Sequence, residues 1–325
     1  MDEFRRQLRA RSYLFALVLT VGLLIANIIA LPAFGAPHNW TANLSLFAPF
    51  MLVACASTPA VISGGGGLDI SIGPLATCIS IFIVAKLLPS STFHSPFLAV
   101  PIALLFGAGV GFTNGFLVAV LRFEPVIATL CMLFVLTGVA LEITPEAGGA
   151  PAGNWTTALT GHTLGVVGPL LLIAAPIVVW WALGRTPLLR HLYGVGANDA
   201  AAFSAGVNVT AVRIFAYTLG GVFAGVAGIA LAAILQAADA TLIGSYTLIA
   251  IAAVVLGGTA IGGGRGGLLN SILGASTIFL LQNFLTSIHV SANWQQPAYG
   301  AMLLAGVILG SLALRQRPPK ARAAA

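Results

Sequence analysis

Side chains able to perform covalent or metal chemistry are few in this chain, and their spacing matches no catalytic pattern. A phosphate-binding GxxxxGK[ST] loop needs a lysine after glycine, and neither lysine, Lys86 or Lys320, has that context. A HExxH zinc site needs two histidines four residues apart. The histidines are instead scattered over the chain, at His38, His94, His162, His191 and His289. We therefore expect no enzyme activity, no bound cofactor and no metal site.

Glycine-rich interruptions are the next chemically informative feature. Residues 63–74 (SGGGGLDISIGP) contain four consecutive glycines, each of which disfavours a helix interior by about 1 kcal/mol relative to alanine. Asp69 or Ser71 is expected to cap the helix that follows, with Pro74 in its first turn. A second block, residues 256–267, is similar in composition. The first block is either an unwound segment that lines a cavity at membrane depth or an ordinary cytoplasmic turn.

A polar residue and a set of small residues stand out within long apolar runs. Asn114 is either a hydrogen-bonding packing residue or part of a pore lining. The glycines near it recur at four-residue spacing, and a similar pair follows later: Gly107, Gly111 and Gly115, then Gly221 and Gly225. Small faces of this kind let helices approach closely in lipid. Cys55, Cys78 and Cys131 lie in apolar stretches and favour a packing role.

Membrane-spanning helices must position these residues, because the composition excludes a soluble fold. Of the 325 residues, 58% are hydrophobic and only 7% are charged, whereas a soluble domain has about 25% charged residues. One crossing takes about 20 apolar residues. We expect an all-α integral membrane protein with one domain, residues 1–325, and about ten transmembrane helices. The expected helices are residues 13–31, 43–63, 72–88, 97–121, 126–143, 166–183, 212–236, 245–261, 268–288 and 296–314.

The basic residues predict that both termini lie on the cytoplasmic side. This orientation places the tails 1–12 and 315–325 and the connection 184–211 inside, and only Lys86 outside. The residues placed inside are Arg5, Arg6, Arg9, Arg11, Arg122, Arg185, Arg190, Arg213, Arg265, Arg315, Arg317, Lys320 and Arg322. Topology and lipid headgroups then explain the net charge of +6 without nucleic acid. The longest outer loop, residues 144–165, either docks an external partner or is a loose loop.

The inner connection between the sixth and seventh expected helices contains a short helix. Residues 193–197 (YGVGA) are expected to interrupt the structure, and Asn198 then caps a helix over residues 199–204 (DAAAFS). Asp199 in the first turn suits the positive end of the helix dipole, and Gly206 ends the helix. A short helix with one protruding aromatic side chain is typical of an element that docks a cytosolic subunit. The alternative is a helix that lies on the membrane surface.

Five motifs stand in one order along nearly the whole chain. They are residues 66–73 (GGLDISIG), residues 111–130 with GFTNG and RFEPVIATL, residues 194–208 (GVGANDAAAFSAGVN), residues 251–266 (IAAVVLGGTAIGGGRG) and residues 294–296 (WQQ). Together they resemble the permease subunit of bacterial ATP-binding-cassette (ABC) importers for monosaccharides of the ribose, arabinose, galactose and xylose type. Relatives of that family also carry autoinducer-2 and nucleosides.

The resemblance implies a multi-pass permease in the bacterial inner membrane that forms the translocation pathway for a sugar. The implied partners are a cytosolic ATPase that holds ATP and Mg, a periplasmic sugar-binding protein, and a second permease, identical or homologous. Coupling to the ATPase falls on Gly196, Asn198, Asp199, Ala201, Phe203 and Gly206. The pathway falls on Asn114, Ser71, Thr129, Gly66, Gly67 and Asp69, since a sugar needs hydrogen-bonding groups along its path. The binding protein selects the substrate, so this chain does not specify the sugar.

The chain departs from the family pattern before the late glycine block. The family carries E-L-D where this chain has Thr247, Leu248 and Ile249. Either a second, non-identical permease retains the acids, or the chain forms a homodimer whose substrate does not need them. The competing function is a self-sufficient secondary transporter or channel for a small polar solute, which needs ionisable groups inside the membrane. The available acids lie near expected helix ends or in outer loops: Asp69, Glu124, Glu142, Glu146 and Asp239.

Overall fold

Apolar runs form helices throughout the part of the chain that is described. The structure, a computed structural model, describes residues 13–144, 146–151, 154–160, 164–240 and 245–291, and the single positions 294, 297, 298, 300, 301 and 304. The main helices are α2 (Tyr13–Ala30), α4 (Trp40–Ile62), α5 (Ile72–Phe82), α6 (Pro96–Ala119), α7 (Pro125–Ile143), α8 (Val167–Gly184), α11 (Val209–Leu235), α12 (Ser245–Leu256) and α13 (Leu268–Ser287). The shorter helical elements are α3 (Pro32–Gly35), α9 (Pro187–Ala197), α10 (Asp199–Ser204), the 3₁₀ turns Pro37–Asn39 and Trp155–Thr160, and the π turn Ile83–Leu87.

Among the described residues, six helices are long and apolar enough to cross a membrane, and three more apolar helices are shorter. The shorter ones are Leu14–Ala30, Ile72–Leu87 and Tyr246–Leu256. The expected helix 296–314 and both tails, 1–12 and 315–325, lie outside the continuous described ranges. A multi-pass helical protein is therefore confirmed, whereas a count of about ten crossings is not.

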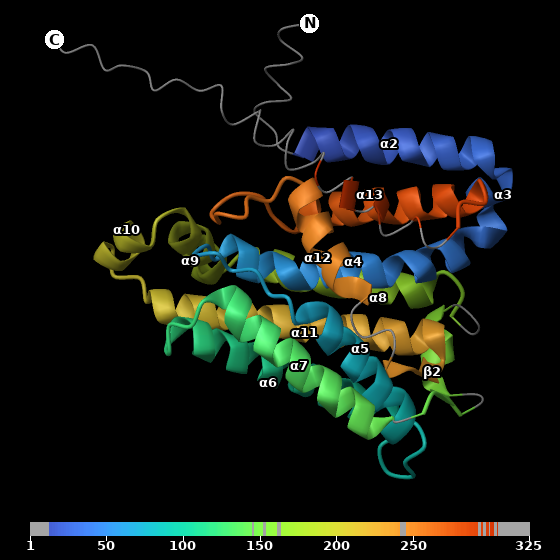
Figure 1. Ribbon diagram of the computed structural model, residues 1–325, viewed down its shortest axis with the longest axis horizontal. Helices are drawn as coiled ribbons and strands as arrows, with labels where there is room; N and C mark the ends of the chain where they lie inside the picture. The colour runs from blue at the N-terminus through green and yellow to red at the C-terminus, as the bar shows by residue number, and fades with distance from the viewer. Residues whose placement is uncertain are drawn as a thin grey trace, which may run out of the picture.

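Two helices form the centre of the bundle. In the most apolar 18-residue stretch of each helix, 89% of the residues are buried in α4 and 72% in α11. The corresponding share is 22% in each of α6, α7 and α8. Figure 1 shows α4 and α11 through the middle, with α2 and α13 on one side and α6 and α7 on the other. The outer helices expose large apolar side chains such as Leu105, Phe134 and Val178, as expected of surfaces in contact with lipid.

The glycine faces of α6 and α11 pack against each other within the same chain. A Cβ atom on Gly111 would lie 3.0 Å from the Cα of Thr218, and a Cβ atom on Gly107 would overlap the Gly221 carbonyl oxygen. A Cβ atom on Gly225 would lie 3.1 Å from the Ala103 carbonyl oxygen. The close approach predicted from these glycines is therefore confirmed, and it is intramolecular. A second permease would have to bind another surface.

Two short helices meet inside the bundle. α12 has 12 residues and is about 18 Å long, and α5 has 11 residues, about 17 Å, before it continues through the π turn to Leu87, so neither spans the roughly 30 Å hydrocarbon core of a membrane. A Cβ atom on Gly73 in the first turn of α5 would lie 2.5 Å from the amide nitrogen of Thr247 in the first turn of α12. The first turns of the two helices are thus in contact. Figure 1 shows both helices at the middle of the bundle.

The end of the bundle away from α10 (Figure 1) contains the one feature that departs from the all-α expectation among the described residues. Strand β1 (Gly148–Gly149) pairs antiparallel with β2 (Ala237–Ala238), with Gly148 opposite Ala238. Next to it, Asn154 Nδ2 donates to Gln236 Oε1 over 2.8 Å, and Gln236 Nε2 donates to Thr156 Oγ1 over 2.8 Å. These bonds attach the described part of the loop 144–165 to the end of α11. That part is therefore not a loose loop.

Candidate functional site

The short helix α10 projects at the end of the bundle opposite β2 (Figure 1). Asn198 has an extended backbone, and its Oδ1 accepts from the amide of Ala201 over 3.0 Å. The helix ends where Gly206 takes a left-handed φ of +83° and the Val207 amide donates to the Ala202 carbonyl over 3.0 Å. The helix, its cap and its glycine stop are as predicted from the sequence. No atom outside its own neighbours lies within 4 Å of a Cβ at Gly206, so its backbone conformation alone calls for glycine.

One side of α10 packs onto the bundle and the other faces outward. Ala202 is 8% exposed and belongs to an apolar cluster with Ile62 of α4, Val195 of α9 and Val212 of α11. Phe203, by contrast, is 73% exposed. An exposed phenylalanine on a helix that is held by its opposite side can insert into a partner without loss of the helix position.

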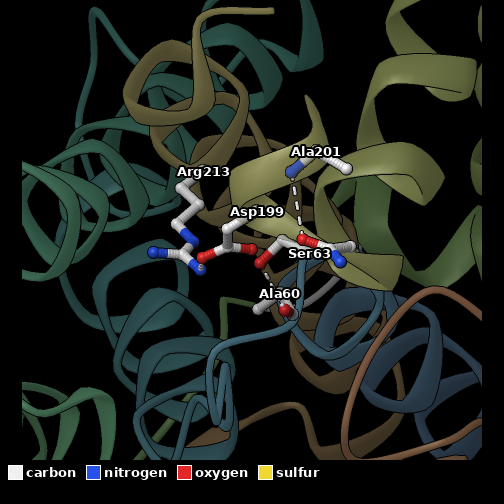
Figure 2. Close-up of polar contacts among 6 residues, drawn as sticks. Ala60, Ser63, Asp199, Ala201 and Arg213 are labelled. Carbon is white, nitrogen blue, oxygen red and sulfur yellow. Dashed lines mark hydrogen bonds and ion pairs between the residues drawn. The ribbon is translucent and has the colours of Figure 1, made fainter. Parts of the chain in front are cut away.

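An ion pair fixes the first turn of α10 to α11. Asp199 pairs with Arg213, whose side chain is 20% exposed while that of Asp199 is 48% exposed. Figure 2 shows the two charged groups facing each other, with Ala60 and Ser63 at the end of α4 nearby. The guanidinium also lies against the first glycine-rich block, residues 63–74, which we call the first glycine loop. A Cβ atom on Gly65 in this loop would be 2.5 Å from Arg213 Nη2. Arg213 thus links α10, α11 and this loop, a role that its sequence position did not reveal.

The expected break at residues 193–197 is wrong. Helix α9 runs unbroken through Gly194 and Gly196 to Ala197, and the chain leaves helical geometry only at Asn198. Gly196 is needed for a different reason: a Cβ atom there would overlap the carbonyl oxygen of Ile62 and lie 2.6 Å from the amide nitrogen of Gly264. The glycine therefore allows close approach of backbones and does not interrupt the helix.

The predicted pathway residues form one buried polar group. Asn114 Nδ2 donates to Ser71 Oγ over 2.8 Å and lies 3.4 Å from Asp69 Oδ2, and the Ser71 hydroxyl and amide both donate to Asp69 Oδ1. The Thr129 hydroxyl accepts from the amide of Ile70 over 3.2 Å. Asn114, Ser71 and Thr129 are fully buried, and Asp69 is 3% exposed.

The first glycine loop contains Asp69 and Ser71 and so supplies part of the backbone around this polar group. Gly66 has a φ of +73°, and Gly67 approaches α4 so closely that a Cβ atom there would overlap the Ala60 carbonyl oxygen. Ser71 occupies the N-cap position of α5, as expected, but its side chain makes no capping hydrogen bond. The third helical residue is Pro74, which has no N–H for a cap to bind, and the Asp69 carboxylate already accepts two bonds from Ser71.

Sequence reasoning missed Tyr217 as a member of this region. The side chain is 1% exposed, its hydroxyl has no hydrogen-bond partner, and the Asn114 Oδ1 atom also has none. A Cβ atom on Gly115 would lie 3.2 Å from the Tyr217 Cβ, which places the two helices α6 and α11 in contact here. The only signal in the sequence was a phenol within an otherwise apolar run.

Two cavities lie at the other end of the bundle. One of about 400 Å³ is lined by Leu88, Ser90, His94, Ser95, Pro96, Pro151, Asn154 and Trp155. The other, of about 420 Å³, is lined by Val84, Ala85, Pro89, Ile143, Thr144, Glu146, Gly148, Gly149 and Ala238. Neither includes a predicted pathway residue. In the described conformation the polar group around Asn114 is therefore closed off from both cavities.

The chain is similar in sequence to known transport proteins. The family described as "Branched-chain amino acid transport system / permease component" matches residues 40–312. The ribose import permease protein RbsC of Bacillus subtilis is 34% identical over 300 residues, which cover 91% of this chain and 90% of that protein. The galactofuranose transporter permease protein YtfT of Escherichia coli is 34% identical over 280 residues, 79% of this chain and 77% of that protein.

A more distant relative is also a permease. The autoinducer 2 import system permease protein LsrC of Yersinia pestis is 33% identical over 216 residues, 64% of this chain and 59% of that protein. No solved structure matches the chain. The family match extends from α4 past the last described helix, and the relatives span most of the chain. The chain therefore belongs to the permease component family of the branched-chain amino acid transport system type, as a membrane-spanning translocation subunit of a binding-protein-dependent importer.

Proposed function

We propose that this chain carries a monosaccharide across the bacterial inner membrane, driven by a separate ATPase that docks on α10. The observation that carries the proposal is the geometry of α10: a capped helix fixed by Ala202 and Asp199 that presents an exposed phenylalanine. Relatives named for ribose and galactofuranose import support the substrate class. The chain itself hydrolyses nothing, and ATP and Mg are held by the partner.

Each coupling residue has a part in this proposal. Asn198 and Asp199 hold the start of α10, the Ala201 amide donates the capping hydrogen bond to Asn198, and Gly206 ends the helix. Phe203 enters the ATPase surface. Gly196 lets α9 sit against the end of α4, so that a movement of α10 reaches the bundle. The transmission is a rigid-body movement of packed helices.

The translocation pathway passes the buried polar group. Asn114, Ser71, Thr129 and Asp69 supply hydrogen-bonding atoms, and the unwound backbone at Gly66 and Gly67 supplies more. A permease that receives its cargo from a binding protein gains nothing from tight binding. A few hydrogen-bonding groups along the pathway are therefore sufficient for passage of a sugar. The group is closed in the described conformation and opens when the ATPase changes state.

A cytoplasmic position of α10 is part of the proposal, and the distribution of arginines supports it. The ends of α6 and α8, helix α9 and the loop 257–267 gather at the α10 end of the bundle (Figure 1), and these segments carry Arg122, Arg185, Arg190 and Arg265. The Arg185 guanidinium lies 3.8 Å from the centre of the Trp181 ring, a pairing suited to the membrane–water interface. Both termini are then cytoplasmic, and the periplasmic binding protein docks at the opposite end. A second permease, identical or homologous, completes the pathway.

The deciding experiment isolates the complex through a tag on this chain from its native source. We expect an ABC ATPase to copurify, and ATP hydrolysis to rise when the periplasmic binding protein loaded with ribose is added to the reconstituted complex. Purification of the chain alone, with uptake driven by an ion gradient, would instead establish a secondary transporter.

A further inference from the structure

Three segments that are far apart in the sequence meet through their backbones beside α10. A Cβ atom on Gly64, after α4, would lie 2.9 Å from the Cα of Gly196 in α9. A Cβ atom on Gly264 would lie 2.6 Å from the amide nitrogen of Ala197. Gly64 and Gly264 have φ values of +74° and +69°, so each also needs glycine for its conformation. We call Gly64, Gly196 and Gly264 the glycine junction.

Hydrogen bonds hold the glycine junction together. The Gly264 amide donates to the Ile62 carbonyl over 3.0 Å, which joins the loop 257–267 to the end of α4. The Tyr193 hydroxyl on α9 donates to the Gly266 carbonyl over 3.0 Å. Burial raises the pKa of the Tyr193 phenol above its usual value, so the hydroxyl stays protonated and remains a donor. Helix α9 is therefore fixed to both glycine-rich segments.

The glycine junction connects α10 to both short helices. Helix α9 ends at Ala197 and α10 begins at Asp199, so only the cap residue Asn198 separates the two helices. The loop after Gly64 leads directly into α5, and the loop with Gly264 follows α12 directly. The first turns of α5 and α12 touch at Gly73 and Thr247. Backbones in contact have no side-chain rotamers between them that could absorb a displacement.

We propose that the glycine junction moves with α10 as one body and shifts α5 and α12 together when the ATPase closes. The two short helices then open and close the pathway as a pair, since neither can follow α10 without the other. This inference rests on the proposed function, because it needs an ATPase on α10.

The test compares two substitutions on one helix in the intact complex. In Gly196→Ala a methyl group is forced against the Ile62 carbonyl and the Gly264 amide, whereas in Gly194→Ala the new methyl group meets no atom within 4 Å. Each complex is isolated through a tag on this chain and reconstituted. ATP hydrolysis is measured with and without the binding protein loaded with ribose. We expect Gly196→Ala to retain the ATPase subunit but to lose its stimulation by roughly tenfold or more, while Gly194→Ala behaves as the unaltered chain.

A second substitution, which adds no atom, keeps the test decisive if Gly196→Ala misfolds. Tyr193→Phe removes only the hydrogen bond to Gly266, and we expect stimulation to fall roughly 2- to 10-fold with unchanged assembly. If Gly196→Ala does not accumulate in the membrane, this variant decides the question. Normal stimulation in Gly196→Ala, or an equal loss in Gly194→Ala, overturns the inference. Failure of the unaltered chain to retain an ATPase overturns the proposed function instead, so the two failures are distinct.

Discussion

Removal of the α10 cap tests the coupling role of this helix with a built-in control. Two asparagines cap helices in the same way: Asn198 accepts from Ala201 and Asn208 accepts from Ala211, each over 3.0 Å. Their helices differ in length, since α10 has 6 residues and α11 has 27. A helix as short as α10 is not stable by itself, because isolated helices need about 12–15 residues. It therefore depends on its cap, on the Asp199 ion pair and on the burial of Ala202.

The expected magnitude follows from the energy of one cap. Replacement of an N-cap asparagine by alanine costs about 1 kcal/mol, which is roughly a fivefold change in an equilibrium constant at 25 °C. We expect Asn198→Ala to reduce ribose uptake by up to about fivefold, because the formed helix is the species that engages the ATPase and a fivefold smaller equilibrium constant lowers its population by at most that factor. In Asn208→Ala the same loss falls on a long, buried helix that stays formed, and uptake is expected to remain near normal.

The assay is uptake of radiolabelled ribose by cells that express each variant, normalised to the amount of chain in the membrane. Asn198→Asp and Asn198→Ser restore a good cap and are expected to restore uptake. Normal uptake in Asn198→Ala would refute the coupling role of α10. Equal losses in Asn198→Ala and Asn208→Ala would show that caps matter only for overall stability.

Three further predictions concern docking, the pathway and the assembly. Phe203→Asp is expected to abolish uptake while the chain remains inserted in the membrane, because a charge replaces the exposed ring. Phe203→Leu is expected to retain much of the uptake. Normal uptake in Phe203→Asp contradicts docking through this side chain. With the exposed Cys131 replaced by serine, the variants Ser71→Cys, Asn114→Cys and Thr129→Cys are expected to react with small hydrophilic thiol reagents in at least one nucleotide state, and no reaction in any state removes these residues from the pathway. The isolated complex is expected to contain two permease chains over two ATPase domains; mass measurement shows whether both are this chain, and a single permease chain refutes the dimer.

Local signals in the sequence were sufficient to predict α10 and the positions of the long helices. An asparagine before a short run, an acid in its first turn and a glycine after it indicate the limits of a helix without any knowledge of the fold. The same logic fell short at α11, which begins at Val209 and not at residue 212, because Asn208 caps it as Asn198 caps α10. Apolar runs likewise indicated the helices, since lipid requires an apolar surface.

Long-range backbone contact was beyond sequence reasoning. Gly64, Gly196 and Gly264 stand in three separate segments, and each could be explained locally as a helix breaker or a turn. Only the fold brings them together. That is why the unbroken course of α9 was not predicted. The partners of Asn114 are a similar case: the sequence indicated a buried polar side chain, but its bond to Ser71 depends on how α6 lies against the segment before α5.

The meeting of α5 and α12 has an electrostatic consequence. Each helix begins where it touches the other, at Gly73 and Thr247, and a helix N-terminus carries about half a positive charge from its aligned peptide dipoles. Two such ends together place positive potential in the interior, and the buried Asp69 carboxylate, which accepts from the amide and hydroxyl of Ser71 just before α5, is the negative group that offsets it, so charge is balanced here without a lysine or arginine.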